Sequence, residues 1–204
     1  MLVEINESNI DKRLITDIVK ELKKGEIIIY PTDTVYAMGC DLMNKKALEK
    51  LSKLKEVRLK QAKFSIICKD LSQVSDYVKQ VNRPTFKLMK QTLPGPFTYI
   101  LNATNEVTRL FNAKRKEIGI KIPDNDIVLS IVEELGNPLV TTSLHDNEDD
   151  LMDYFTDPYE IYERFDDKVG TIIDGGYGKL EASTILDCTD DHPVVIREGV
   201  GKIE

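Results

Sequence analysis

The sequence reads EIIIYPTDTVYAMGC from residue 26 to residue 40, and this stretch decides the fold class. Its first five residues, 26–30, have the β-branched density of a buried strand, and Pro31 ends that strand. Residues 10–24, just before it, place apolar side chains three and four positions apart and are followed by Gly25. That spacing predicts an amphipathic helix closed by a glycine. A helix leading directly into a buried strand indicates a mixed α/β domain.

The same alternation of segments continues along the chain. Helical periodicity predicts further helices over residues 45–54, 71–78, 84–91 and 126–135. Short runs rich in β-formers predict strands over residues 64–68, 97–101, 118–122, 139–143, 171–174, 183–187 and 194–197. The acidic residues 144–157 lack any period and are predicted to form a long surface loop. Because no repeat or linker divides the chain, residues 1–204 are expected to form one domain.

The composition excludes several classes of protein. Hydrophobic residues make up 41% and charged residues 31% of the chain, which excludes collagen-like and wholly disordered proteins. No apolar run approaches the ~20 residues that cross a bilayer, and the first residues do not resemble a signal peptide. The three cysteines, Cys40, Cys68 and Cys188, are far apart, which favours reduced thiols. We therefore expect a cytoplasmic protein without membrane contact.

Charge is distributed unevenly along the chain, whose formal net charge is −7. Residues 45–63 contain eight basic and two acidic residues, whereas residues 146–167 contain ten acidic residues and one arginine. The overall charge argues against general nucleic-acid binding. The basic segment is nevertheless a candidate for binding anionic groups.

Several catalytic motifs are absent from the sequence. There is no Gly-x-x-x-x-Gly-Lys-Ser/Thr loop, and no Gly-x-Gly-x-x-Gly opens a helix, so neither a P-loop nucleotidase nor a Rossmann dehydrogenase is supported. The only histidines, His145 and His192, are too few for a histidine-rich metal site. A hydrolase nucleophile elbow is also missing.

Hydroxyl-bearing and basic side chains instead gather near the ends of predicted strands, where ligands of open α/β sheets collect. The hydroxyl-bearing set is Thr32, Thr34, Tyr36, Thr141, Thr142 and Ser143. Lys55 and Arg58 in the basic segment, and Arg197 near the C-terminus, suit anionic oxygens, through charge-assisted bonds of roughly 1.5–3 kcal/mol each. Taken one at a time, these features fit an ordinary turn or a solvated surface equally well.

In combination, the motifs resemble the YrdC/YciO family of threonylcarbamoyl-adenylate synthases and their paralogues, and are closer to the YciO branch. The matching segments are KKG at 23–25, YPTDTVYAMG at 30–39, LPGPFT at 93–98, GIKIP at 119–123, VTTS at 140–143, ASTILD at 182–187 and VIREG at 195–199. The order of PTDTVY followed by PGPFT is specific, whereas either motif alone is weak. The resemblance covers nearly the whole chain.

The resemblance implies a single-domain α/β fold, a twisted mixed open sheet with flanking helices and a positively charged concave face. It also implies a nucleotidyltransferase reaction in which ATP, L-threonine and bicarbonate give threonylcarbamoyl-AMP and pyrophosphate. Mg²⁺ would accompany the ATP. The product is an intermediate in the threonylcarbamoyl modification of adenosine in certain tRNAs.

The same resemblance assigns roles to individual residues. Those expected to bind threonine are Thr32, Thr34, Tyr36 and Lys121. Those expected to bind the nucleotide are Thr141, Ser143, His145, Ser183 and Arg197. The catalytic pair that would face the phosphates is Lys55 and Arg58.

Three departures from the family pattern accompany these assignments. Lys55 and Arg58 are separated by two residues where the family has one, His145 replaces an asparagine, and Lys121 replaces an arginine. Lysine lacks the rigid fork with which arginine holds a carboxylate in two places. The alternative is a non-catalytic protein that binds double-stranded RNA or tRNA, because one cationic cleft would suit a triphosphate and an RNA backbone alike.

Overall fold

The computed structural model describes residues 1–111, 116–145 and 154–203, and these residues form an α/β fold on one mixed sheet. Its ten strands are β1 (Leu2–Glu4), β2 (Ile28–Tyr30), β3 (Ala37–Asp41), β4 (Ser65–Ile67), β5 (Phe97–Asn102), β6 (Glu117–Lys121), β7 (Leu139–Ser143), β8 (Thr171–Asp174), β9 (Thr184–Asp187) and β10 (Val194–Arg197). The described helices are α1 (Lys12–Lys24), α2 (Lys45–Leu54), α3 (Leu71–Val74), α4 (Arg83–Thr92), α5 (Asn105–Leu110), α6 (Asp126–Leu135) and α7 (Pro158–Phe165).

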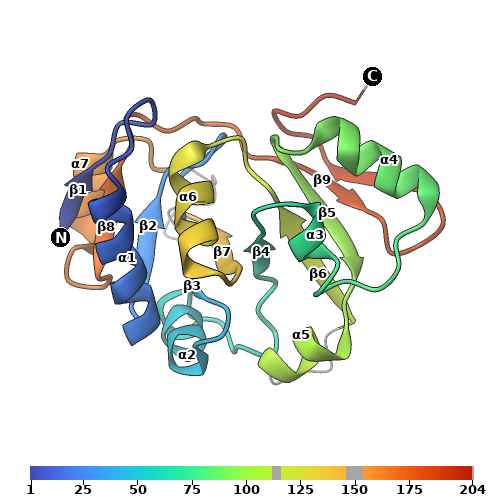
Figure 1. Ribbon diagram of the computed structural model, residues 1–204, viewed down its shortest axis with the longest axis horizontal. Helices are drawn as coiled ribbons and strands as arrows, with labels where there is room; N and C mark the ends of the chain where they lie inside the picture. Colours follow the sequence, from blue (N-terminus) through green and yellow to red (C-terminus); the bar gives the residue numbers. More distant parts are fainter. Residues whose placement is uncertain (112–115, 146–153, 204) are drawn as a thin grey trace.

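The strand order is β1-β8-β2-β3-β7-β4-β6-β5-β9-β10, with β1 and β10 at the two edges. Parallel pairs join β1 to β8, β8 to β2, β4 to β6 and β5 to β9. The remaining neighbours are antiparallel. Figure 1 shows β1 and β9 near opposite ends of the molecule. The predicted mixed open sheet with flanking helices is confirmed.

Two hydrophobic cores lie on the two faces of the sheet. Helices α1 and α6 lie side by side (Figure 1) and pack with residues of β2, β3, β4, β7 and β8 into one core. Residues of α2, α4, α5 and α7 contribute to the other core. Strands β5, β6 and β9 contribute no residue to the core under α1 and α6. We call this side of β5, β6 and β9, together with the adjoining Ser65 of β4 and Thr141 and Ser143 of β7, the open face.

Local capping explains why several predicted bounds agree with the structure. Asn44 caps α2 by accepting a hydrogen bond from the Ala47 N–H at 3.1 Å, and Gly136 ends α6 with a φ of 78°. Both helices have the predicted ends, because a side-chain cap and a left-handed glycine are local signals.

Other elements differ from the prediction. The helix expected over 71–78 ends at Val74, and β1, β3, α5 and α7 were not predicted. Strand β3 includes Gly39 and is buried along its whole length between β2 and β7, so tertiary pairing overrides its weak β-propensity. Of the predicted acidic loop, residues 146–153 lie outside the described part of the chain. Among the described residues, no helix combines the length and hydropathy needed to span a membrane.

A substitution at Gly39 tests the packing between β3 and its neighbours. A Cβ atom at this position would overlap the Val140 carbonyl oxygen and lie 2.8 Å from the Tyr30 hydroxyl. We expect Gly39→Ala to lower the free energy of unfolding by about 3 kcal/mol, because the contact is with paired backbone. Urea denaturation measures this loss. Gly136→Ala, where a Cβ meets no neighbour, should cost only about 1 kcal/mol from its positive φ, and equal losses would contradict the packing argument.

Candidate ligand-binding site

Strand register brings many of the predicted polar residues onto the open face. Ser65 of β4 lies opposite Thr141 of β7 on one side and Gly119 of β6 on the other. Side chains alternate between the two faces along each strand, so residues two apart share a face. The open face therefore carries Ser65, Thr98, Lys121, Thr141, Ser143 and Ser183. These hydroxyls and the single ammonium form a polar surface beside the core under α1 and α6.

Lys121 is the buried cation of this surface. It is the last residue of β6, only 7% exposed, and has no hydrogen-bond acceptor or ion-pair partner among the described residues. Burial lowers the pKa of Lys121, the nearby Asp33 carboxylate raises it, and the Arg197 guanidinium lowers it. We call Asp33, Lys121 and Arg197 the charged cluster. The charge of a lysine whose side chain is buried as a whole is costly unless an anion lies close to it.

Arg197 is fixed in place by the segment before β9. Its Nε and Nη2 donate to the Ser183 carbonyl oxygen at 3.1 and 2.7 Å, and Nη2 also lies 3.3 Å from the Ser183 hydroxyl. The Ser183 hydroxyl shares a hydrogen bond of 2.8 Å with Thr98 of β5. None of these bonds uses Nη1 of Arg197. The guanidinium is therefore held in one orientation and keeps a donor for an anionic ligand.

The threonines of the 30–39 motif use their hydroxyls within their own loop. Thr32 Oγ1 donates to the Val35 carbonyl at 2.7 Å, accepts from the Thr34 N–H at 3.1 Å and lies 3.1 Å from Thr34 Oγ1. Tyr36 donates to the Gly176 carbonyl at 2.7 Å and accepts from the Gly175 N–H at 3.2 Å. These residues shape the loop, and their predicted contact with threonine stays a prediction.

Asp33, between the two threonines, is the residue that the sequence analysis missed. Its Oδ2 accepts a hydrogen bond from the Asp124 N–H at 3.1 Å, while its Oδ1 is buried and accepts none among the described residues. Burial raises the pKa of Asp33, and the Asp124 N–H, Lys121 and Lys179 lower it. The sequence signal that could have identified Asp33 is its position between two threonines at the end of a strand.

The residues expected to bind the nucleotide fall into three places. Thr141 is buried and accepts a hydrogen bond of 2.7 Å from Tyr30, and Ser143, at the end of β7, is half-buried. Ser183 and Arg197 are joined as described above. His145 packs edge-on against Tyr154, with ring centroids 6.2 Å apart. The structure thus gathers Thr141, Ser143, Ser183 and Arg197 around the open face, with His145 just beyond β7.

Lys55 and Arg58 lie in the turn between α2 and β4. Lys55 is the half-buried cap of α2, where burial lowers its pKa, and Arg58 is exposed. Glu56 between them adopts a φ of 54°, which is uncommon for a residue other than glycine. No hydrogen bond or ion pair joins these two side chains to the charged cluster within the described residues. Their turn continues directly into residues 60–63, which line a groove on the open face.

This groove has a volume of about 820 Å³ and crosses β4, β6, β5 and β9. Its lining combines the hydroxyls of Ser65 and Thr98, the acid Glu117, Gly119 and four isoleucines, Ile100, Ile118, Ile185 and Ile196. Lys60, Lys63 and Lys116 add positive charge. Thr98, which bonds to Ser183, connects the groove with the charged cluster. A cavity of this size and mixed character suits a small cofactor or nucleotide.

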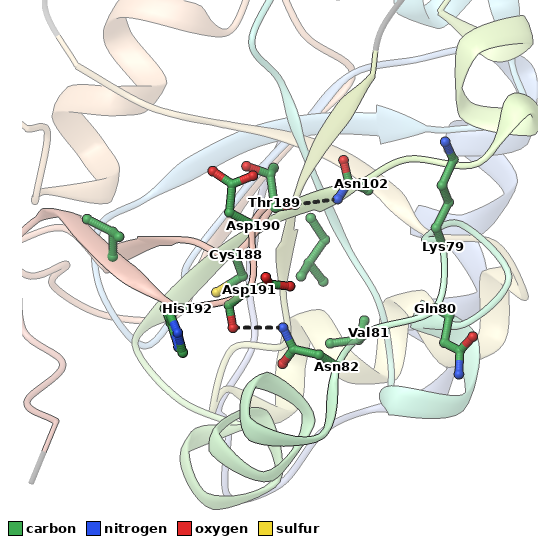
Figure 2. Close-up of a pocket in the computed structure, with 12 residues that line it drawn as sticks. Lys79, Gln80, Val81, Asn82, Asn102, Cys188, Thr189, Asp190, Asp191 and His192 are labelled. Atoms are coloured by element: carbon green, nitrogen blue, oxygen red, sulfur yellow. Dashed lines mark hydrogen bonds between the residues drawn. The ribbon is translucent and has the colours of Figure 1, made fainter.

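A second hollow of about 590 Å³ lies away from the predicted residues (Figure 2). It is bounded by residues 79–82, the end of β5 and the turn between β9 and β10. Asn82 and Asn102 brace that turn by donating to the carbonyls of Asp191 and Thr189 at 3.1 and 2.7 Å. Cys188, which lines this hollow, is a free thiol, and burial raises its pKa to about 11. The hollow contains none of the residues predicted to bind threonine or the nucleotide.

In the part of the chain that the structure describes, protein side chains alone do not form a metal-binding site. No three His, Cys, Asp or Glu side chains come together there as a metal-binding group.

The mixed open sheet, its hydroxyl-lined face, buried Lys121 and half-buried Arg197 define a class of α/β proteins with a polar, cationic sheet face. A model of the Sua5/YciO/YrdC family, described as "Telomere recombination", matches residues 20–199. The chain therefore belongs to the Sua5/YciO/YrdC family, and the resemblance found in its motifs is confirmed.

Individual relatives agree with this assignment. The uncharacterized protein YciO of Escherichia coli is 40% identical over 201 residues, which cover 98% of this chain and 96% of the relative. Its crystal structure superposes with a TM-score of 0.88 over 99% of this chain and 97% of that one. A putative threonylcarbamoyl-AMP synthase of Methanocaldococcus jannaschii is 33% identical, covering all of this chain and 93% of the relative.

A solved structure with lower sequence identity also superposes on this fold. The crystal structure of P. abyssi Sua5 complexed with L-threonine superposes with a TM-score of 0.87 at 24% identity. The match covers 98% of this chain and 57% of that one. At this identity the likeness concerns the fold.

Proposed function

We propose that this protein binds ATP and L-threonine on the open face and forms threonylcarbamoyl-AMP from them and bicarbonate. The observation that carries the proposal is the charged cluster, in which buried Lys121 interacts with Asp33 and Arg197 beside an open groove of nucleotide size. Support also comes from a family relative named as a putative threonylcarbamoyl-AMP synthase, with 33% identity over the whole chain.

The threonine carboxylate would bind to the cations of the cluster. Lys121 offers an ammonium in a water-poor environment, and Arg197 offers the donor Nη1 that its bonds to Ser183 leave unused. Charge-assisted hydrogen bonds to a carboxylate are strongest where water is excluded. Lys121 binds the carboxylate at one point rather than through a rigid fork, because it is not an arginine.

The nucleotide would occupy the groove. Its isoleucines offer apolar contact to a base, and the Ser65 hydroxyl, which packs over Gly119, offers a hydrogen-bonding group. Lys60 and Lys63, together with Lys55 and Arg58 on the preceding turn, would face the phosphates. Mg²⁺ is proposed to arrive with the triphosphate as part of the substrate.

The reaction depends on the positioning of its substrates and needs no nucleophile from the protein. Threonine carboxylated on its amine carries an anionic oxygen that attacks the α-phosphorus of ATP, and the bond from that phosphorus to the pyrophosphate oxygen breaks. The negative charge that develops on the leaving pyrophosphate is stabilised by Mg²⁺ and the nearby cations. Holding both substrates on one rigid sheet supplies the orientation.

Pyrophosphate release from purified protein with MgATP, L-threonine and bicarbonate tests this function. We expect release that depends on both threonine and bicarbonate, and stabilisation by MgATP of about 2.7 kcal/mol at a hundredfold excess over its Kd. Assays that omit one substrate at a time serve as controls. Absence of turnover and of any MgATP stabilisation, combined with salt-dependent binding of double-stranded RNA, would contradict the proposal and support the RNA-binding alternative.

A further inference from the structure

We propose that Asp33 is the residue that binds the ammonium group of the amino-acid substrate and accepts its proton before carboxylation. This inference rests on the proposed function and assigns to it a catalytic residue that neither the motif comparison nor the reaction at phosphorus requires. It starts from an acceptor atom, Asp33 Oδ1, that is buried and accepts no hydrogen bond among the described residues.

The charges in the cluster are complementary to those of a zwitterionic α-amino acid, which carries an ammonium and a carboxylate. Lys121 and Arg197 suit a carboxylate, whereas Asp33 is the only acid in the charged cluster and suits an ammonium. Oδ2 of Asp33 is held by the Asp124 N–H at 3.1 Å, so the carboxyl group is oriented and its other oxygen remains available. An α-amino acid presents both charges on adjacent groups, as the cluster requires.

The charged groups around Asp33 come from three segments. Lys121 lies at the end of β6, Lys179 in the connection before β9, and Asp124 in the turn before α6. Burial and, as the smallest effect, the Asp124 carboxylate favour the protonated form, while the Asp124 N–H and the two lysines favour the carboxylate form. Burial is the largest of these effects and raises the pKa of Asp33 above that of an ordinary aspartate. An acid with a raised pKa holds a proton more readily than one in water.

The proton transfer completes the chemistry that precedes attack on ATP. Threonine enters as an ammonium, which has no lone pair, and Asp33 takes one proton to leave a neutral amine and a protonated carboxyl group. The amine nitrogen then bonds to the bicarbonate carbon, the carbon–hydroxyl bond breaks, and water leaves with one amine proton. The product is the N-carboxylate anion, and Asp33 later returns its proton to water.

Asp33→Asn is a suitable variant, because the amide oxygen can still accept the Asp124 N–H while the charge is lost. We expect it to weaken L-threonine binding by about 10- to 100-fold in calorimetric titration. Binding of 3-hydroxybutyrate, which is threonine without its amino group, should stay within about twofold of wild type. Glu181→Gln, which removes an exposed carboxylate near Ser183, is the matched control and should change neither affinity.

The proton-acceptor role has its own readout. Pyrophosphate release by Asp33→Asn should rise about tenfold per pH unit toward the pKa of the free amine, because solution deprotonation replaces the lost base. The wild type should change much less over the same range, and Asp33→Glu should restore part of the preference for threonine over 3-hydroxybutyrate.

Several results would overturn the inference. Equal weakening of both ligands by Asp33→Asn would show that Asp33 is structural, and unchanged threonine affinity would show that it does not meet the ammonium. Parallel pH profiles for variant and wild type would remove the proton-acceptor role. Wild type that binds neither ligand would instead reject the proposed function itself, and the inference with it.

Discussion

Alanine at both Lys55 and Arg58 is expected to slow pyrophosphate release by about 10²-fold or more while adenosine affinity barely changes. The physical reason is that negative charge grows on the departing pyrophosphate, and cations on the turn after α2 stabilise it only in the transition state. Lys55 is half-buried, so its charge is screened less by water than that of an exposed lysine. Steady-state kinetics at saturating MgATP measures the loss.

Lys45→Ala with Lys46→Ala is the matched control for this double variant. Both are exposed lysines in the first turn of the same helix, α2, so the change in net charge is identical. The control should keep nearly full turnover. If RNA binding is the true function, each pair should instead lower the salt slope of RNA affinity by roughly two units. Equal effects of the two pairs on turnover would contradict a specific role for Lys55 and Arg58.

Lys121→Met is expected to weaken L-threonine binding by about 10²-fold or more, and to make the protein more stable at neutral pH. In the proposed function, loss of the buried ammonium removes the charge that would meet the substrate carboxylate, and breaking a buried ion pair typically costs about 3–5 kcal/mol. Replacing a buried ion pair by apolar side chains is neutral or stabilising by about 1–4 kcal/mol, and we expect the same direction for Lys121, because burial lowers its pKa. Titration calorimetry and thermal unfolding measure the two effects on the same samples.

The sign of the pH dependence follows from the lowered pKa of Lys121. Between this lowered value and the ordinary value of 10.5, the unfolded chain binds more protons than the folded one. The Lys121 contribution therefore makes wild type gain stability as pH rises through that interval, and Lys121→Met lacks this gain. The stability difference should shrink toward pH 10.5. A variant less stable than wild type at pH 7 would contradict this account, and Lys121→Met with Asp33→Asn tests whether the unpaired Asp33 is responsible.

Much of the fold could be predicted because its signals are local. The strands β7, β8 and β10 and the helices α2 and α6 have the predicted bounds. Their ends coincide with caps, glycines and changes in β-branched density, which a short window of sequence contains. By contrast β3, with Ala37 and Gly39, has weak local preference, and only its two neighbours make it a strand.

Individual residues of the candidate site could be predicted from the sequence, but their arrangement in space could not. Hydroxyls at strand ends and the basic segment pointed to several of its residues, and the family resemblance added Lys121 and Ser183. Asp33 was missed because a carboxylate in a turn is ordinarily solvated, and its burial depends on Asp124 and Lys121, far away in the sequence. The hydrogen bonds from Arg197 to Ser183 depend on the pairing of β5, β9 and β10, which a short stretch of sequence does not predict.

The charged cluster joins three segments separated by long stretches of chain: Asp33 near one end, Lys121 in the middle and Arg197 near the other end. During synthesis, a nascent chain that has not yet released β10 from the ribosome has no Arg197 in place and hence no complete site. Contacts of such long sequence separation also form late, because loop closure must precede them. Under the proposed function, turnover would therefore require completed folding of the chain, and we expect fragments that retain only an N-terminal half to show none.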